Sequence, residues 1–356
     1  MILIFHIRSD VSFGTSGRMH RRYRKKKGKN ITMADLVDDA SENELYEYLV
    51  YSSISSDEIT DRPNFFWHYT NINGLIGITK EPSKLCFWFT DKNFLNDTSE
   101  GKEILIVYRR VCEKLYKYKQ ISKEFYDTIK DLVPHNKAAF WVDTKEGRHP
   151  MMVDCRLFVC SFSDAEDSLD MWRYYAKEHD GYSLKLSSDI DFSFREDCKK
   201  TFDENFFIKA QKVCYDDSNK DDLIRKMLLS IYEKYENCVK ESKEVTLANN
   251  WIQQAISSYL TKNQLLFKHS CFASENEYRI IVGVNDPSGS ASNVIQFRAG
   301  NAGLTPYIQL TATIHHLVEI KVGPFQTDPQ KHSIESYKRS KKLDCDITYS
   351  ELPVRF

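Results

Sequence analysis

The segment that decides the fold is residues 156–186, which read R-L-F-V-C-S-F-S-D-A-E-D-S-L-D-M-W-R-Y-Y-A-K-E-H-D-G-Y-S-L-K-L. Residues 156–162 form a short apolar run, which predicts a buried strand. Residues 168–177 predict a helix, and residues 181–186 predict the next strand. This mixture of strand and helix within one short segment indicates an α+β protein.

The same mixture continues on both sides of this segment. Upstream, the apolar spacing predicts strands at 65–69 and 85–89, helices at 42–52 and at 71–79 with Asn71 as a cap, and two helices within 100–132. Downstream, a strand at 207–215 precedes the almost wholly helical residues 221–267, and further strands follow at 278–284, 294–297, 307–310, 317–322 and 346–349, with a helix at 333–340. We therefore expect an α+β fold with a mixed or antiparallel sheet, outer helices and a helical insertion at 221–267.

The first 32 residues differ in composition from the rest of the chain. Residues 18–29 contain eight basic side chains, and such a block is usually solvated and often contacts polyanions. The alternative is that translation starts at Met33. We therefore place no function on residues 1–32, and we expect residues 33–356 to form one domain.

Composition restricts the class of protein. The chain has 356 residues, with 50 Lys and Arg against 51 Asp and Glu, so no global charge attracts nucleic acid or a membrane. No apolar run approaches the roughly 18 residues that would indicate a transmembrane helix. The nine cysteines are scattered and form no C-x-x-C motif, so we expect reduced thiols, no metal site and a cytoplasmic location.

Two segments could carry binding chemistry. Trp67-His68-Tyr69-Thr70 ends one predicted strand and opens a helix, so His68 and Thr70 would stand beside an anion or ribose site at a helix N-terminus. The alternative is a buried histidine bonded to a carbonyl, with an ordinary cap. In the segment from Ser161 to Gly181, Trp172 and Tyr175 could stack on a planar ring, although aromatic residues one helical turn apart more often fill a core.

A third segment could carry catalysis. Glu275-Asn276-Glu277 leads into a predicted strand, and residues two apart on a strand point to the same side. Adjacent like charges repel, so a functional carboxylate pair is one reading, and a hydrated strand entrance is the other. No Gly-rich phosphate loop, G-x-S-x-G elbow or H-E-x-x-H motif is present, which argues against dinucleotide-binding Rossmann domains, P-loop enzymes, α/β-hydrolases and zincins.

Together these segments resemble a bacterial family defined only as a domain of unknown function. The resemblance lies in W-H-Y-T, L-N-D-T-S-E (95–100), M-W-R-Y-Y-A and E-N-E-Y-R, and in a tail that includes T-P-Y-I (305–308) and K-V-G-P (321–324). It covers about residues 64–356. That family in turn resembles a distant branch of the ADP-ribosyltransferase fold, which implies an ADP-ribosyltransferase-type sheet and NAD as a substrate.

The resemblance also implies roles for individual residues. His68 would contact the NAD ribose with help from Thr70, and Tyr69, which replaces the small residue that often follows this His, would belong to the same site. Ser161 and Ser163 would match the middle-strand serines, with Trp172 or Tyr175 stacking on nicotinamide. Glu277 would be the catalytic carboxylate and Glu275 would orient or deprotonate the acceptor.

The expected function is NAD-dependent ADP-ribosylation of a macromolecule, with RNA or DNA narrowly favoured over protein. The resemblance further implies a toxin or an anti-phage defence effector that a neutralising antitoxin protein controls. An NAD glycohydrolase and a noncatalytic nucleic-acid-binding or partner-binding module remain alternatives. The enzymatic hypotheses require that His68, an aromatic ring and Glu277 line one cleft.

Overall fold

A computed structural model describes residues 63–95, 101–134, 136–144, 147–176, 181–194, 206–241, 245–285, 294–300 and 303–353. The basic segment 18–29, the helix expected at 42–52 and the polar loop at 96–100 lie outside the described residues. Among the described helices, none combines the length and the apolar character that crossing a membrane requires.

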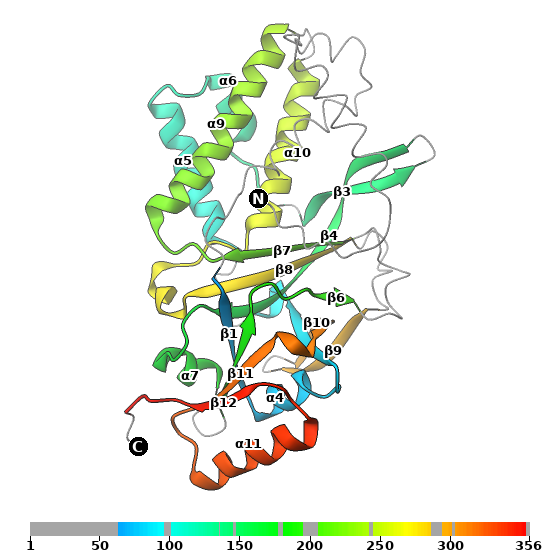
Figure 1. Cartoon of the computed structure of the whole chain (residues 1–356). Helices are drawn as coiled ribbons and strands as arrows, with labels where there is room; N and C mark the ends of the chain where they lie inside the picture. Colours follow the sequence, from blue (N-terminus) through cyan, green and yellow to red (C-terminus); the bar gives the residue numbers. More distant parts are fainter. Residues whose placement is uncertain are drawn as a thin grey trace, which may run out of the picture.

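The fold is α+β with a mixed, mostly antiparallel sheet (Figure 1). The strands are β1 (Phe65–Asn71), β2 (Lys84–Asp91), β3 (Lys137–Thr144), β4 (Gly147–Ser163), β5 (Gly181–Ser187), β6 (Ser193–Phe194), β7 (Phe206–Lys212), β8 (Glu277–Asn285), β9 (Ile295–Gly300), β10 (Gly303–Thr313), β11 (Leu317–Val322) and β12 (Asp346–Tyr349). The main strand order is β12-β11-β5-β1-β4-β2-β10-β6, and β8 joins β4 to β7. Of the pairs described, only β11 with β12 is parallel.

The long strand β4 organises this sheet. Its first half forms a hairpin with β3, and its second half pairs with β8 from Cys155 to Ser163. It also pairs with β1 at Ser163 and with β2 at Val159 and Phe158. The sheet therefore divides beside β4, because β1 leads to β5 and β11 whereas β2 leads to β10.

The helices form two groups. They are α4 (Ile72–Ile78), α5 (Glu103–Lys117), α6 (Lys123–Ile129), α7 (Leu169–Tyr175), α9 (Asp217–Glu241), α10 (Val245–Asn263) and α11 (Asp328–Lys341), with the 3₁₀ turns η1 (Lys92–Phe94), η2 (Ser270–Glu275) and η4 (Ile314–His316). Helices α5, α6, α9 and α10 gather at the top of Figure 1, above the sheet, and share one apolar core with β4 and β8. The predicted helical region 221–267 thus corresponds to α9 and α10.

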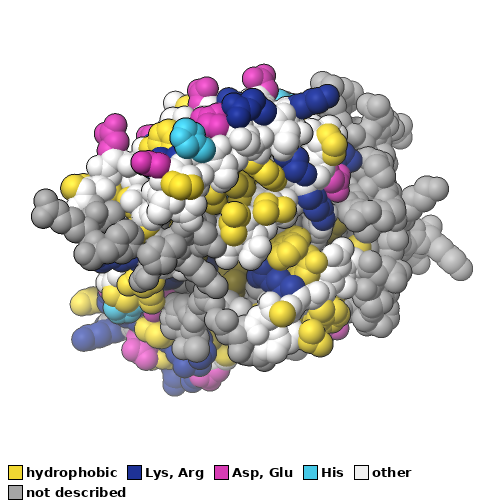
Figure 2. Space-filling model, turned by 90° about the horizontal axis from the view of Figure 1, so that it is seen from below, with side chains coloured by type: hydrophobic (Ala, Val, Ile, Leu, Met, Phe, Trp, Pro, Cys, Tyr) yellow, Lys and Arg dark blue, Asp and Glu magenta, His cyan; other side chains and the backbone are white. Residues whose placement is uncertain are grey.

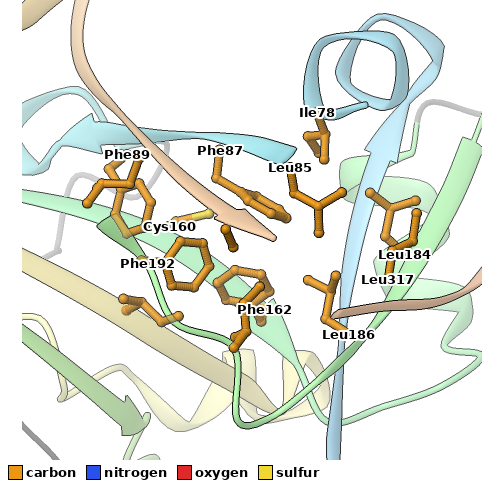
Figure 3. Packing of buried hydrophobic residues seen from close by; sticks show 14 of the residues in the cluster. Ile78, Leu85, Phe87, Phe89, Cys160, Phe162, Leu184, Leu186, Phe192 and Leu317 are labelled. Carbon is orange, nitrogen blue, oxygen red and sulfur yellow. The ribbon is translucent and has the colours of Figure 1, made fainter. Parts of the chain in front are cut away.

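A second apolar core, called here the sheet core, lies between the two divided parts of the sheet. Figure 3 shows Phe87, Phe162 and Phe192 gathered in it, with Leu184 and Leu186 nearby. These aromatic side chains are almost fully buried, and full burial of each such side chain contributes roughly 1.5–3 kcal/mol. Because the apolar side chains of each strand point into the sheet core, the intervening residues point to the opposite face of the sheet.

Short helices cover the lower end of the molecule. Helix α4 is capped by Asn71, whose side chain accepts a hydrogen bond of 3.0 Å from the Gly74 amide, and this confirms the sequence prediction. Its outer side leaves Ile72 and Ile76 exposed. Figure 2, which views the molecule from below, shows hydrophobic and basic side chains around a hollow on this side.

Candidate functional site

The three segments singled out in the sequence lie on three neighbouring strands, β1, β4 and β8. Trp67 pairs with Ser163, and Ser163 pairs with Glu277. Two residues further along, Ser161 pairs with Arg279. Segments far apart in the sequence therefore lie on adjacent strands of the sheet.

Glu277 stands at the centre of a buried ion-pair cluster. Its two carboxylate oxygens accept hydrogen bonds from Nε and Nη2 of Arg279, both at 2.8 Å. The Lys268 ammonium lies 3.2 Å from the same carboxylate. Glu277, Arg279 and Lys268 are all buried, with at most 5% of any of them exposed. Two cations therefore hold this carboxylate in a fixed position.

Glu275 joins the cluster from a different element. It ends η2, and Asn276 follows in the left-handed conformation at φ 43°, which Asn tolerates better than most residues. This turn lets the Lys268 ammonium bond to Glu275 at 2.5 Å as well as to Glu277. The sequence reasoning had placed both carboxylates on one strand, and that is wrong, because β8 begins only at Glu277.

The two carboxyl groups have pKa values moved in opposite directions. Burial would raise the pKa of Glu277, but the charges and hydrogen bonds of Arg279 and Lys268 outweigh it and lower the pKa to about 2. Burial raises the pKa of Glu275 above its ordinary value, although Lys268 opposes that shift. One carboxylate is therefore firmly ionised, and the other binds a proton more readily than a carboxyl group in water.

Both middle-strand serines contact this cluster. A hydrogen bond from the Ser161 side chain helps to lower the pKa of Glu277. Ser163 is fully buried, and its hydroxyl donates to the Glu275 carbonyl oxygen at 2.6 Å while accepting from the Ala165 amide at 3.1 Å. Ser161 therefore touches a carboxylate, whereas Ser163 fixes the backbone that carries Glu275.

The structure does not bring the His68 side chain to Glu277. The His68 ring lies 5.4 Å from the rings of Phe87 and Phe162, in the sheet core. Phe162 neighbours Ser161 and Ser163 along β4 and therefore points to the opposite face from them. The expectation that His68 and Glu277 line one cleft does not hold in this structure, because their side chains leave the sheet from opposite faces.

His68 instead bonds to the backbone where the sheet divides. Its Nδ1 donates to the Ser161 carbonyl oxygen at 3.0 Å, between the points where β1 and β2 pair with β4. Burial lowers the pKa of His68, and this hydrogen bond opposes the shift only in part, so the ring is neutral at pH 7. This arrangement matches the alternative of a buried histidine bonded to a carbonyl.

The aromatic candidates separate into core residues and one site residue. Trp172 is only 1% exposed, and its indole N–H donates to Asp167 at 2.6 Å, so it presents no open face to a ligand. Tyr69 is buried against Trp172, and its hydroxyl donates to the Ala165 carbonyl oxygen at 2.8 Å. Tyr175 is half-buried, and its hydroxyl lies 3.3 Å from the Glu275 carboxylate.

Thr70 lies on the same side of β1 as His68, since the two are separated by one residue. It is 9% exposed, and the backbone of Gly74 packs directly over it, because a Cβ on Gly74 would lie 1.8 Å from the Thr70 hydroxyl. Thr70 therefore supports the start of α4 and lies away from the carboxylates.

Sequence reasoning missed three residues of the cluster. Lys268 follows the helical region and carried no motif, so only the fold brings it to the carboxylates. Arg279 could have been predicted as a neighbour of Glu277, because residues two apart on a strand share a face. Tyr215 accepts a hydrogen bond of 3.1 Å from the Glu277 amide, and burial raises its pKa.

Within the described residues, no group of three or more His, Cys, Asp or Glu side chains is arranged to hold a metal ion. Comparison with curated proteins and with solved structures found no match. Residues 171–280, which include Tyr175, Lys268, Glu275, Glu277 and Arg279, match the model of a family described as "Protein of unknown function (DUF2971)".

Proposed function

We propose that this protein is an NAD-dependent ADP-ribosyltransferase whose chemistry is carried by Glu275 and Glu277. One observation supports this proposal most: two carboxyl groups joined by one lysine have pKa values moved in opposite directions. Such a separation is typical of sites in which one carboxyl group stays ionised and the other exchanges a proton. NAD as the donor comes from the family resemblance of the sequence.

The chemistry divides naturally between the two groups. When the bond from ribose C1′ to the nicotinamide nitrogen breaks, its electron pair leaves with nicotinamide and a positive charge develops on the ribose. An unpaired carboxylate would stabilise that charge by about 4 kcal/mol at a distance of 4 Å and an effective dielectric near 20. The charges of Arg279 and Lys268 make this the upper value for Glu277. Glu275 would take the proton from the attacking acceptor group, whose oxygen or nitrogen forms the new bond to C1′.

Neighbouring residues would position these carboxylates. Lys268 and Arg279 fix the two oxygens of Glu277, and the Ser161 hydroxyl adds a further hydrogen bond. Tyr175 is the half-buried aromatic residue beside Glu275, so it is the better candidate of the two for stacking on nicotinamide. In this proposal His68 has a positioning role through the Ser161 backbone and does not contact the ribose.

The acceptor in this proposal is a macromolecule, and nucleic acid is favoured over protein. A toxin or anti-phage defence role, with a neutralising protein partner, belongs to the same proposal and rests on the family resemblance. Hydrolysis of NAD by the same carboxylates would occur if water replaced the acceptor, and a noncatalytic role would leave NAD unchanged.

The test uses NAD labelled on the adenine and a bacterial lysate fractionated into RNA, DNA and protein. Wild type is expected to attach label to one fraction, and Glu277→Gln is expected to reduce the rate by up to roughly three powers of ten. Glu275→Gln should also reduce the rate, and it should reduce transfer to the macromolecule more than hydrolysis of NAD.

The matched control is Glu319→Gln on β11. Glu319 is similarly buried at 8% exposure and also lies near lysines, at 3.7 Å from Lys185 and 3.6 Å from Lys321. This control should keep wild-type labelling. Label that stays as free ADP-ribose would indicate a glycohydrolase, and equal labelling by wild type and Glu277→Gln would remove the enzyme assignment.

A further inference from the structure

A second cluster of aromatic and basic side chains lies on strands β2, β9 and β10. The Arg298 guanidinium lies over the rings of Trp88 and Tyr307, at 5.3 Å and 5.9 Å from their centroids. The two rings are 4.9 Å apart. Arg298 also donates to the Thr90 hydroxyl at 2.8 Å, which fixes the plane of its guanidinium. We name Trp88, Tyr307, Arg298 and Gln309, together with Lys80 from the segment before β2, the β2–β10 platform.

The face of β2, β9 and β10 that points away from the sheet core has cations but no carboxylates. Phe87, Ile308 and Ile295 point into the sheet core, so alternate residues on the three strands point to the other face. Those residues are Lys84, Cys86, Trp88, Thr90, Thr305, Tyr307, Gln309, Thr311, Thr313, Gln296 and Arg298. None of these positions carries a carboxylate, whereas two carry cations.

Gln309 gives a separate indication of a ligand. It lies directly opposite Trp88 in the register of β2 and β10. It is only 6% exposed, and its amide nitrogen has no hydrogen-bond partner. Its amide oxygen accepts from the Lys80 ammonium at 3.1 Å, which orients the amide nitrogen away from Lys80. A buried N–H donor without a partner costs free energy unless a ligand supplies an acceptor.

We propose that the β2–β10 platform binds single-stranded nucleic acid. Trp88, which is 40% exposed, would stack on an unpaired base. The Gln309 amide would donate to an acceptor on a base edge, and Lys80, Lys84 and Arg298 would contact phosphates. Tyr307 is buried at 7% exposure, so Trp88 is the exposed ring of the platform. A ligand that is both planar and anionic fits this exposed ring beside cations, with no carboxylate at the neighbouring strand positions.

This inference deepens the proposed function, because it identifies the macromolecule that receives ADP-ribose. Thr90 pairs with Val159, and Val159 pairs with Ile281, which lies on the same face of β8 as Glu277. The platform and the carboxylates therefore lie on the same face of the sheet, and the helical core that includes Val159 and Ile281 covers the part of this face between them. A nucleic acid bound at Trp88 would extend past that helical core to reach Glu275 and Glu277.

The test is fluorescence anisotropy with a labelled RNA single strand of roughly 12 nucleotides, with the same DNA sequence and a duplex as further probes. Wild type is expected to bind the single strands more tightly than the duplex, since stacking needs unpaired bases. Trp88→Ala should weaken binding roughly 5-fold to 150-fold. Arg298→Gln should weaken binding and reduce its dependence on salt concentration.

Tyr118→Ala is the matched control, because Tyr118 is 67% exposed and lies at the end of α5, away from the platform. It should bind the RNA like wild type, and Trp88→Phe should restore part of the affinity that Trp88→Ala loses. Absence of binding by wild type, or equal binding by wild type and Trp88→Ala, would overturn this inference.

The platform and the enzyme assignment can be refuted independently of each other. If Trp88-dependent binding is present but no label is transferred, the platform stands and the enzyme assignment fails. If label is transferred to nucleic acid with equal efficiency by wild type and Trp88→Ala, the platform fails and the enzyme assignment stands.

Discussion

The buried carboxylate of Glu277 should make the stability of the protein depend on pH in a defined range. Two cations hold the pKa of Glu277 at about 2, against an ordinary value of 4.5. Because the pKa is lower in the folded protein, the stabilisation is fully present above pH 4.5 and is lost as the pH falls towards 2. Glu277→Gln removes this titration.

The size of the effect follows from the two pKa values. The interval from 4.5 to about 2 corresponds to about 3 kcal/mol of folding free energy at neutral pH. About 2 kcal/mol of this is lost between pH 7 and pH 3, since the carboxylate is by then protonated in the unfolded chain and still ionised in the folded one. At neutral pH the substitution costs more, because Arg279 and Lys268 lose a buried partner.

The assay is urea unfolding followed by tryptophan fluorescence at several pH values. The comparison is made between Glu275→Gln and the double variant Glu275→Gln/Glu277→Gln, because the charge of Glu277 also raises the pKa of Glu275. The difference in unfolding free energy should shrink by about 2 kcal/mol from pH 7 to pH 3. A difference that stays constant over this range would refute the buried ion-pair cluster.

Three other substitutions have defined outcomes. Gly181→Ala should destabilise the protein by about 1–3 kcal/mol, since a Cβ there would lie 2.9 Å from the Ala176 carbonyl oxygen; a wild-type melting temperature would contradict this. Gly77→Ala should instead stabilise by about 0.4–1 kcal/mol, because nothing lies within 4 Å of its Cβ position in α4, and a loss of stability would show a clash. Lys268→Met should lower the free energy of unfolding by about 3–5 kcal/mol at neutral pH and raise the pKa of Glu275 further. The stability of this variant should therefore recover as the pH falls and Glu275 binds a proton. A loss of stability that does not change with pH would exclude the contact between Lys268 and Glu275.

Local sequence signals predicted most of the elements. The two helices predicted within 100–132 are confirmed as α5 and α6, and Lys119, which lies between them, has a positive φ of 57°. The hairpin of β3 with the first half of β4 was missed, because the pairing of two strands is not visible in the residue spacing along one of them. Helix α11 begins earlier than expected, at Asp328, owing to a capping box of Thr327 and Gln330 that the sequence does contain.

The sequence by itself predicted most of the strands, and the family resemblance selected Ser161, Glu275 and Glu277, which the structure brings into one cluster. Only the tertiary structure decided which side chains share a face with them. The register of β1 against β4 rests on one pair, Trp67 with Ser163, and neighbouring residues on a strand point to opposite faces. That register sends His68 into the sheet core, and the chain beyond α10 brings Lys268 to the carboxylates, because a contact between distant segments depends on how the strands pair in space.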